Sequence, residues 1–226
     1  MLTFPLVLMI VLVFLYPVYR GVVLSFYQGK QFVAFANYGE MFSNPNFWHS
    51  LLLTLYYVFL YTVGIFAVGF FTALILRQAE STRAKGENVA GSLIMMPYAI
   101  PDVVAALIWF VMFDPQYGVL NFFLGVVGFA PVKWLLNPDI AMYSVIIATV
   151  WRLFPVHCMI ILSGFRAVPK ELYEAAEIDG ASGIRQFFNI TLPYIKNILG
   201  LLMMLTIVWS FKRFTVLWLL TGGGPG

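Results

Sequence analysis

The sequence predicts an all-α, polytopic transmembrane helical bundle, and three observations support this fold class. Hydrophobic residues make up 62% of the chain and charged residues 10%, with a mean hydropathy of +0.89, which lies outside the usual range of soluble domains. Five apolar stretches are each long enough to cross a hydrocarbon core of about 30 Å. The basic residues gather in alternate connections, as in membrane proteins. We therefore expect one transmembrane domain over residues 1–226.

The five expected spans lie at about residues 2–26, 47–76, 92–113, 140–165 and 197–220. No basic residue precedes the first run and no small-residue cleavage site follows it, which favours a span over a signal peptide. Gly69 in the second span favours close helix packing. Pro97 and Pro101 in the third span each remove a backbone donor, so we expect that helix to be bent or interrupted.

Basic residues predict which ends of the spans face the cytoplasm. The connections after the second and fourth spans hold Arg77, Arg83, Lys85, Arg166, Lys170, Arg185 and Lys196. The opposite connections hold only Lys30 and Lys133. The positive-inside rule therefore places residues 166–196 in the cytoplasm and the Gly-rich end outside.

Composition and spacing also exclude several classes of function. Cys158 is the single cysteine, so no intrachain disulfide can form, and no Cys/His cluster has metal-ligand spacing. The scattered basic residues form no stripe of the kind that nucleic acid requires. The Gly run at 222–224 lacks the Gly-Lys-Ser/Thr of a phosphate loop, and no catalytic constellation has useful spacing. We expect no catalytic residue, metal, cofactor or nucleic-acid partner.

A polar segment between the last two expected spans, residues 168–193, predicts two short helices separated by a turn. Pro169 suits the first turn of a helix. Gly180 can supply the left-handed residue that ends this helix, and Ser182 can cap the second. Glutamates line one face, so the first helix alone fits either a solvated surface or a docking surface. Its apolar stripe consists of Leu172, Ala175 and Ala176.

The spacing of residues within this segment is distinctive. It comprises Glu174, Ala175, Ala176, Asp179, Gly180, Ile190, Leu192 and Pro193. This spacing resembles the EAA loop of permease subunits in binding-protein-dependent ABC importers. The resemblance implies that these residues form an ATPase-coupling loop, whose short cytoplasmic helix docks into a groove on an ATPase subunit.

The similarity to that family extends over nearly the whole chain. The stretch 97–109 resembles the family in general. The stretches 151–155, 162–169 and 220–225 resemble its carbohydrate branch, the permeases related to those for maltose, other oligosaccharides and glycerol phosphate. The resemblance implies a bacterial or archaeal inner membrane, two ABC ATPase subunits, a second permease subunit and an extracytoplasmic solute-binding protein, besides membrane lipid. Because family members continue into a sixth span, we expect that this chain is truncated at its C-terminus.

Charged and aromatic side chains within the spans are candidates for a solute pathway. A charge at mid-membrane costs about 2.5–3.5 kcal/mol, so we expect Asp102 to pair with a basic group or to face an aqueous path. The basic groups within the spans are Arg152, Lys212 and Arg213. His157 fits either a satisfied buried histidine or a proton relay. Aromatic platforms for a sugar, with helix packing as the alternative, are Tyr98, Trp109, Trp151 and Trp209.

The sequence therefore predicts the permease subunit of an ATP-driven importer for a sugar or sugar-like solute. Because no Walker motif is present, ATP hydrolysis is expected on a separate chain. Closure of the ATPase dimer would move the helix of residues 169–179 as a rigid lever. The alternative is a secondary transporter driven by an ion gradient, in which Asp102, Arg152 and His157 carry protons.

Overall fold

The computed structural model describes residues 3–81 and 87–224, and helices form nearly all of that part of the chain. The predicted all-α membrane fold class is confirmed. The chain divides into two compact units, Met1–Leu55 and Tyr56–Gly226. Arg83 and Lys85, which contributed to the predicted orientation, lie outside the described residues.

The first unit contains an apolar helical segment followed by a short hairpin. A π-helical turn in this segment ends two residues before Pro17, which has no N–H to donate and whose ring crowds the carbonyl four residues earlier. Gly29 makes the hairpin turn with a φ of +62°, a conformation that glycine adopts without strain. The elements are α1 (Thr3–Ile10), η1 (Val11–Leu15), α2 (Tyr16–Leu24), β1 (Tyr27–Gln28), the antiparallel β2 (Gln31–Phe32) and α3 (Ala36–Ser43).

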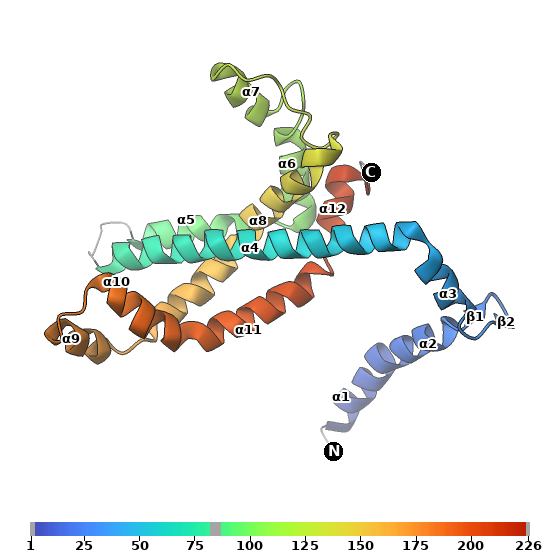
Figure 1. Cartoon of the computed structure of the whole chain (residues 1–226), viewed down its shortest axis with the longest axis horizontal. Coiled ribbons are helices and arrows are strands. Elements are labelled where there is room, and N and C mark those ends of the chain that lie inside the picture. Colours follow the sequence, from blue (N-terminus) through green and yellow to red (C-terminus); the bar gives the residue numbers. More distant parts are fainter. Residues whose placement is uncertain (1–2, 82–86, 225–226) are drawn as a thin grey trace. The chain divides into compact units, whose positions relative to one another are not determined.

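The second unit is built from helices that begin with α4, which starts within the first unit. Figure 1 shows α9 and α10 at one end of α8 and α7 beyond its other end. The elements are α4 (Pro45–Ser81), α5 (Glu87–Ala99), α6 (Asp102–Met112), α7 (Val119–Val126), α8 (Pro138–Arg166), α9 (Lys170–Ile178), α10 (Gly183–Gln186), η2 (Phe187–Thr191), α11 (Leu192–Ser210) and α12 (Phe214–Thr221).

Within the described residues, four uninterrupted segments are long and apolar enough to cross a membrane, and the bent pair of α5 and α6 makes a fifth. The pair bends by 97° between Ala99 and Asp102. Pro97 and Pro101 flank this break, as expected from the backbone donors that they lack. The interruption predicted for the third span is therefore confirmed.

The last long helix has different limits from those expected. Helix runs without interruption from Gly183 to Ser210 through α10, η2 and α11, so the second half of the polar segment is continuous with the span. The π-helical turn η2 lets the Leu192 N–H donate to the Phe187 carbonyl just before Pro193, which has no N–H of its own. Residues 211–213 then separate α11 from α12. The expected span 197–220 is thus interrupted at residues 211–213.

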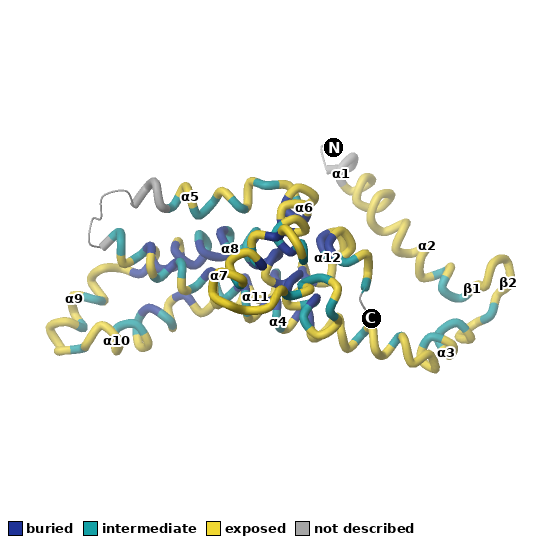
Figure 2. Tube along the Cα trace, turned by 90° about the horizontal axis from the view of Figure 1, so that it is seen from above, coloured by how far each residue is buried: buried dark blue, intermediate teal, exposed yellow. Residues whose placement is uncertain are grey.

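Helix α8 forms the centre of the second unit. Of its most apolar stretch, 61% is buried, against 28% for α4 and 22% for the helix that contains α11. The buried positions follow α8 in Figure 2. In α4, Gly69 permits close contact with α8, because an added Cβ would lie 2.8 Å from the Cβ of His157. This agrees with the packing role predicted for that glycine.

Asn121 organises the connection between α6 and α8. This side chain is 6% exposed. Its amide nitrogen donates to the carbonyls of Asp114, Pro115 and Val132, and its oxygen accepts from the Val132 N–H and the Trp134 indole. A buried amide with all these partners fixes the connection around α7, because breaking any of the bonds would leave a polar group unpaired.

Candidate functional site

The first helix of the polar segment ends as its sequence predicts. Gly180 has a φ of +70°, in the left-handed region that favours glycine. The Gly180 N–H donates to the Glu177 carbonyl at 3.0 Å, and the Ala181 N–H donates to the Ala176 carbonyl at 2.8 Å. These two bonds make a Schellman motif, which satisfies carbonyls at the end of α9 and turns the chain toward α10.

Tyr173 attaches α9 to the rest of the second unit. Its hydroxyl lies 2.6 Å from the Thr191 hydroxyl in η2, and Arg77 in α4 donates to it at 2.9 Å. The Arg77 guanidinium also lies over the rings of Phe165 and Tyr173, with distances of 5.2 and 5.3 Å to the centroids. One tyrosine therefore links α9 to α4 and to the long helix that begins at Gly183. Sequence reasoning did not identify Tyr173, because its partners are 96 and 18 residues away.

The other face of α9 and the turn that follows it are exposed. Leu172 and Ala175 of the expected apolar stripe are exposed, whereas Ala176 is half-buried. Ile178 is 88% exposed and Ile184 is 74% exposed. Large apolar side chains with this exposure, bordered by glutamates, are typical of a surface that another protein covers.

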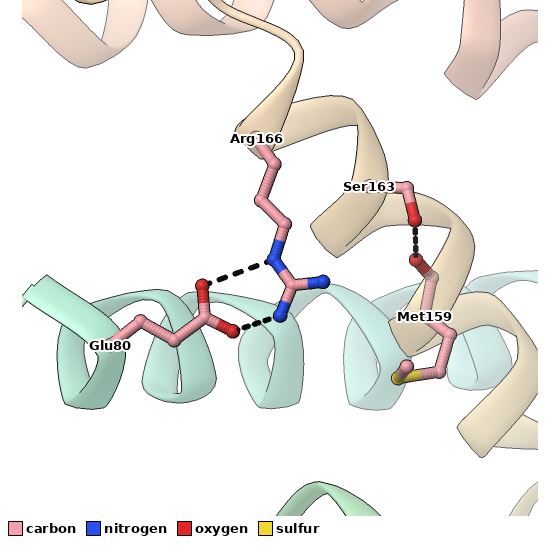
Figure 3. Close-up of polar contacts among 4 residues, drawn as sticks. All are labelled: Glu80, Met159, Ser163 and Arg166. Atoms are coloured by element: carbon pink, nitrogen blue, oxygen red, sulfur yellow. Dashed lines mark hydrogen bonds and ion pairs between the residues drawn. The ribbon is translucent and has the colours of Figure 1, made fainter. Parts of the chain in front are cut away.

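An ion pair ties the end of α8, just before α9, to the end of α4. Arg166 donates to both carboxylate oxygens of Glu80 (Figure 3). On the same turn of α8, the Ser163 hydroxyl donates to the Met159 carbonyl at 2.8 Å (Figure 3). The helix that leads into α9 is therefore held to α4 by a bidentate contact in addition to the Tyr173 contact.

A second polar group of contacts lies at the break between α5 and α6. The Arg152 guanidinium of α8 forms an ion pair with Asp102 at 2.7 Å and donates to the Ile100 carbonyl at 2.8 Å. The prediction that Asp102 pairs with a basic group is confirmed. Arg152 thus contacts the carbonyl that follows α5 and the carboxylate in the first turn of α6. The cation lies at the negative C-terminal end of α5 and the carboxylate at the positive N-terminal end of α6, so the helix dipoles favour both charges.

A cavity of about 450 Å³ opens beside this ion pair. The volume lies within the range of about 300–1,000 Å³ that is common for small-molecule sites. Tyr98 and Trp209 contribute aromatic faces, and they are 45% and 43% exposed. The remaining lining residues are Asp102, Arg152, Leu153, Val156, His157 and Arg213. Five of the seven predicted pathway residues therefore line one cavity.

The other two predicted pathway residues, Trp109 and Trp151, pack against each other. Their ring centroids are 5.7 Å apart in an edge-to-face arrangement, and Trp109 is 7% exposed. Trp109 also contacts Phe113, with 5.1 Å between centroids. Neither tryptophan lines the cavity. For this pair the structure favours the alternative role in helix packing.

His157 contributes to helix packing as well as to the cavity wall. It is 4% exposed, its Nε2 lies 2.8 Å from the Thr206 hydroxyl of α11, and Phe66 contacts its ring. Within residues 3–81 and 87–224, no hydrogen bond joins His157 to Asp102 or Arg152. The proton path of the alternative function thus has no continuous hydrogen-bonded connection in this part of the chain.

Comparisons with known proteins address the identity of the chain. Residues 69–226 match the family of binding-protein-dependent transport system inner membrane components. The trehalose/maltose transport system permease protein MalF of Thermococcus litoralis is 36% identical over 202 residues, which are 89% of this chain and 67% of that protein.

Two solved structures have the same fold. A bacterial ABC transporter involved in the import of the acidic polysaccharide alginate has a TM-score of 0.85 and 23% identity, over 96% of this chain and 74% of that one. A bacterial alginate ABC transporter in complex with a periplasmic protein that holds an alginate pentasaccharide has a TM-score of 0.80 and 23% identity, over 91% and 69%.

Proposed function

Since the chain belongs to the family of binding-protein-dependent transport system inner membrane components, we propose that it is the permease subunit of an ATP-driven importer for a sugar or sugar-like solute. The name of the trehalose/maltose relative supports the solute class. The cavity with two exposed aromatic faces also supports it, because aromatic rings stack on the apolar faces of sugars.

The coupling element in this proposal is α9 together with the turn at Gly180. The residues assigned to it are Glu174, Ala175, Ala176, Asp179, Gly180, Ile190, Leu192 and Pro193. The exposed apolar side chains around the turn, which include Ile178 and Ile184, support a role in docking. In the proposal, these side chains bind in a groove on an ABC ATPase subunit.

The continuous helix from Gly183 to Ser210 supplies the mechanical connection. Its 28 residues span roughly 40 Å at about 1.5 Å per residue. Thr191 near its start contacts Tyr173 of α9, and Trp209 near its end lines the cavity. A displacement of α9 by closure of the ATPase dimer would therefore reach the cavity through one rigid helix. The continuity of this helix is the single observation that supports the lever most strongly.

The proposal also places partners around the chain. Two ABC ATPase subunits bind at the cytoplasmic face, where the excess of basic residues places α9. A second permease subunit provides the rest of the pathway, and a solute-binding protein delivers solute at the opposite face. The periplasmic protein in the alginate transporter complex supports that last partner.

Co-purification with the ATPase subunit tests the coupling element. Gly180→Val forces a β-branched residue into a left-handed conformation, which is unfavourable by at least about 1–2 kcal/mol, so the ATPase is expected to be lost. Gly183→Ala is the matched control, because it lies in the same segment and its added Cβ would meet nothing within 4 Å. Wild-type recovery of the ATPase with Gly180→Val would contradict the proposal.

A further inference from the structure

Two helix breaks meet at the same cavities. The break between α5 and α6 carries Asp102, and the break between α11 and α12 carries Lys212 and Arg213. Besides the cavity of about 450 Å³, a neighbouring one of about 220 Å³ is also lined by Asp102, Trp209 and Arg213, with Lys212 in addition. The walls shared by the two cavities therefore come from both breaks.

The charges that line these cavities are unequal in number. Three cations, Arg152, Lys212 and Arg213, stand against one carboxylate, Asp102. Arg152 already holds that carboxylate at 2.7 Å. Within the described parts of the chain, neither Lys212 nor Arg213 forms an ion pair. Two positive charges in the cavity walls are thus left without a neutralising acid among the described residues.

Of the two cations without an ion pair, Arg213 is the more buried. It is half-buried, its guanidinium carbon lies 5.8 Å from the centroid of the Tyr61 ring, and its Nε is buried without a hydrogen-bond partner. A buried N–H donor without a partner is costly, by about 1–3 kcal/mol, unless a ligand satisfies it. The planar guanidinium suits the two oxygens of a carboxylate, phosphate or sulfonate.

The backbone adds to the positive potential. Thr215 and Val216 are in the first turn of α12, so the wall of the smaller cavity includes a helix N-terminus, whereas the N-terminus of α6 already holds the Asp102 carboxylate. The N-terminus of a helix carries about half a positive charge and attracts anions. Side chains and backbone therefore favour the same sign of ligand charge.

We propose that this pair of cavities selects an anionic sugar-like solute, with Arg213 and Lys212 binding its acidic group and Trp209 contacting its ring. This inference rests on the proposed importer function and names the class of its solute. A neutral sugar would leave both cations without a counterion and the buried Arg213 Nε without an acceptor. An acidic sugar would satisfy them at once.

Binding of two matched sugars to the whole importer complex tests this selectivity. The complex of this chain with its partner permease and ATPase subunits is placed in nanodiscs of zwitterionic phosphatidylcholine. Galactose and galacturonate, which differ only at C6, are titrated while tryptophan fluorescence is followed. We expect galacturonate to bind at least about tenfold more tightly, because one charge-assisted contact is worth about that factor.

Variants assign the preference to Arg213. Arg213→Gln is expected to abolish the galacturonate preference, and Arg213→Lys to keep most of it. Lys133→Gln removes the same charge outside both cavities and is expected to leave binding unchanged. Equal binding of the two sugars, no binding of galacturonate, or an unchanged preference in Arg213→Gln would each overturn the inference.

The same preparation separates the inference from the proposed function. Recovery of an active ATPase with the chain tests the importer assignment, whatever sugar is bound. An ATPase-containing complex without a preference for galacturonate would refute the anionic solute alone. Absence of the ATPase would refute the importer function itself. If anionic phosphatidylglycerol added to the nanodiscs abolished galacturonate binding, the cavities would be a lipid phosphate site instead, and the inference would also be overturned.

Discussion

The ion pair between Asp102 and Arg152 gives the most quantitative prediction. Arg152→Gln removes a contact of 2.7 Å to the Asp102 carboxylate and one of 2.8 Å to the Ile100 carbonyl. Removing one partner from a fully buried pair destabilises a protein by about 3–5 kcal/mol. Here the Asp102 side chain is 43% exposed and can be hydrated, although Arg152 is only 14% exposed. We therefore expect a loss of about 2 kcal/mol.

Asp102→Asn should have a smaller effect, because its amide oxygen still accepts from Arg152 and the bond to the Ile100 carbonyl remains. We expect about 1 kcal/mol for this variant. A double-mutant cycle of Asp102→Asn and Arg152→Gln, measured by reversible unfolding in mixed detergent micelles, should give a coupling energy of about 1 kcal/mol. A coupling energy below about 0.3 kcal/mol would refute the claim that this ion pair stabilises the break between α5 and α6.

Three further substitutions follow from contacts in the second unit. Tyr173→Phe keeps the ring but removes the hydroxyl that joins α9 to α4 and η2. The amount of solute transported per ATP hydrolysed should therefore fall. Tyr194→Phe, at an exposed site, is the control and should leave this ratio unchanged. Gly69→Ala should destabilise the protein by about 1–3 kcal/mol in the same unfolding assay, because its Cβ would lie 2.8 Å from a side chain of α8. Gly200→Ala is its control, since an added Cβ there meets nothing within 4 Å, and equal effects of the two would contradict the packing role of Gly69. Asn121→Ala should cost about 2–3 kcal/mol by leaving buried carbonyls and donors unpaired; proteolysis of the connection around α7 should show it, and an unchanged cleavage rate would count against this role.

Local chemistry made part of the fold and site predictable. Pro97 and Pro101 lack backbone donors, so an interruption of the third span follows from covalent structure alone. Gly180 follows an apolar and acidic helical stretch, and its freedom at positive φ predicts a helix end there. A charge in the membrane needs a partner, which predicts the Asp102 ion pair without saying which of the three cations supplies it.

Other features depend on contacts that hydropathy does not encode. Lys212 and Arg213 interrupt the apolar run, but charges within one span fit the same pattern, so the sequence does not locate the break between α11 and α12. Pro193 suggests a helix start, but a π-helical turn accommodates it within one long helix. Tyr173 becomes important only because the fold brings Arg77 and Thr191 to its hydroxyl. Trp109 and Trp151 looked like ligand platforms because their type suits both packing and sugar stacking.

Cross-linking from α9 tests the central claim most directly, that this helix docks on an ATPase subunit and drives the cavity through the helix of residues 183–210. A photoreactive amino acid replaces Ala175, which is exposed on α9, in the assembled complex. The matched position is Tyr117, which is 87% exposed and lies just before α7 in the sequence. The account predicts an ATPase adduct from position 175 that increases when a non-hydrolysable nucleotide closes the dimer, and none from position 117. An adduct only from position 117, or none from position 175 in an intact complex, would contradict it.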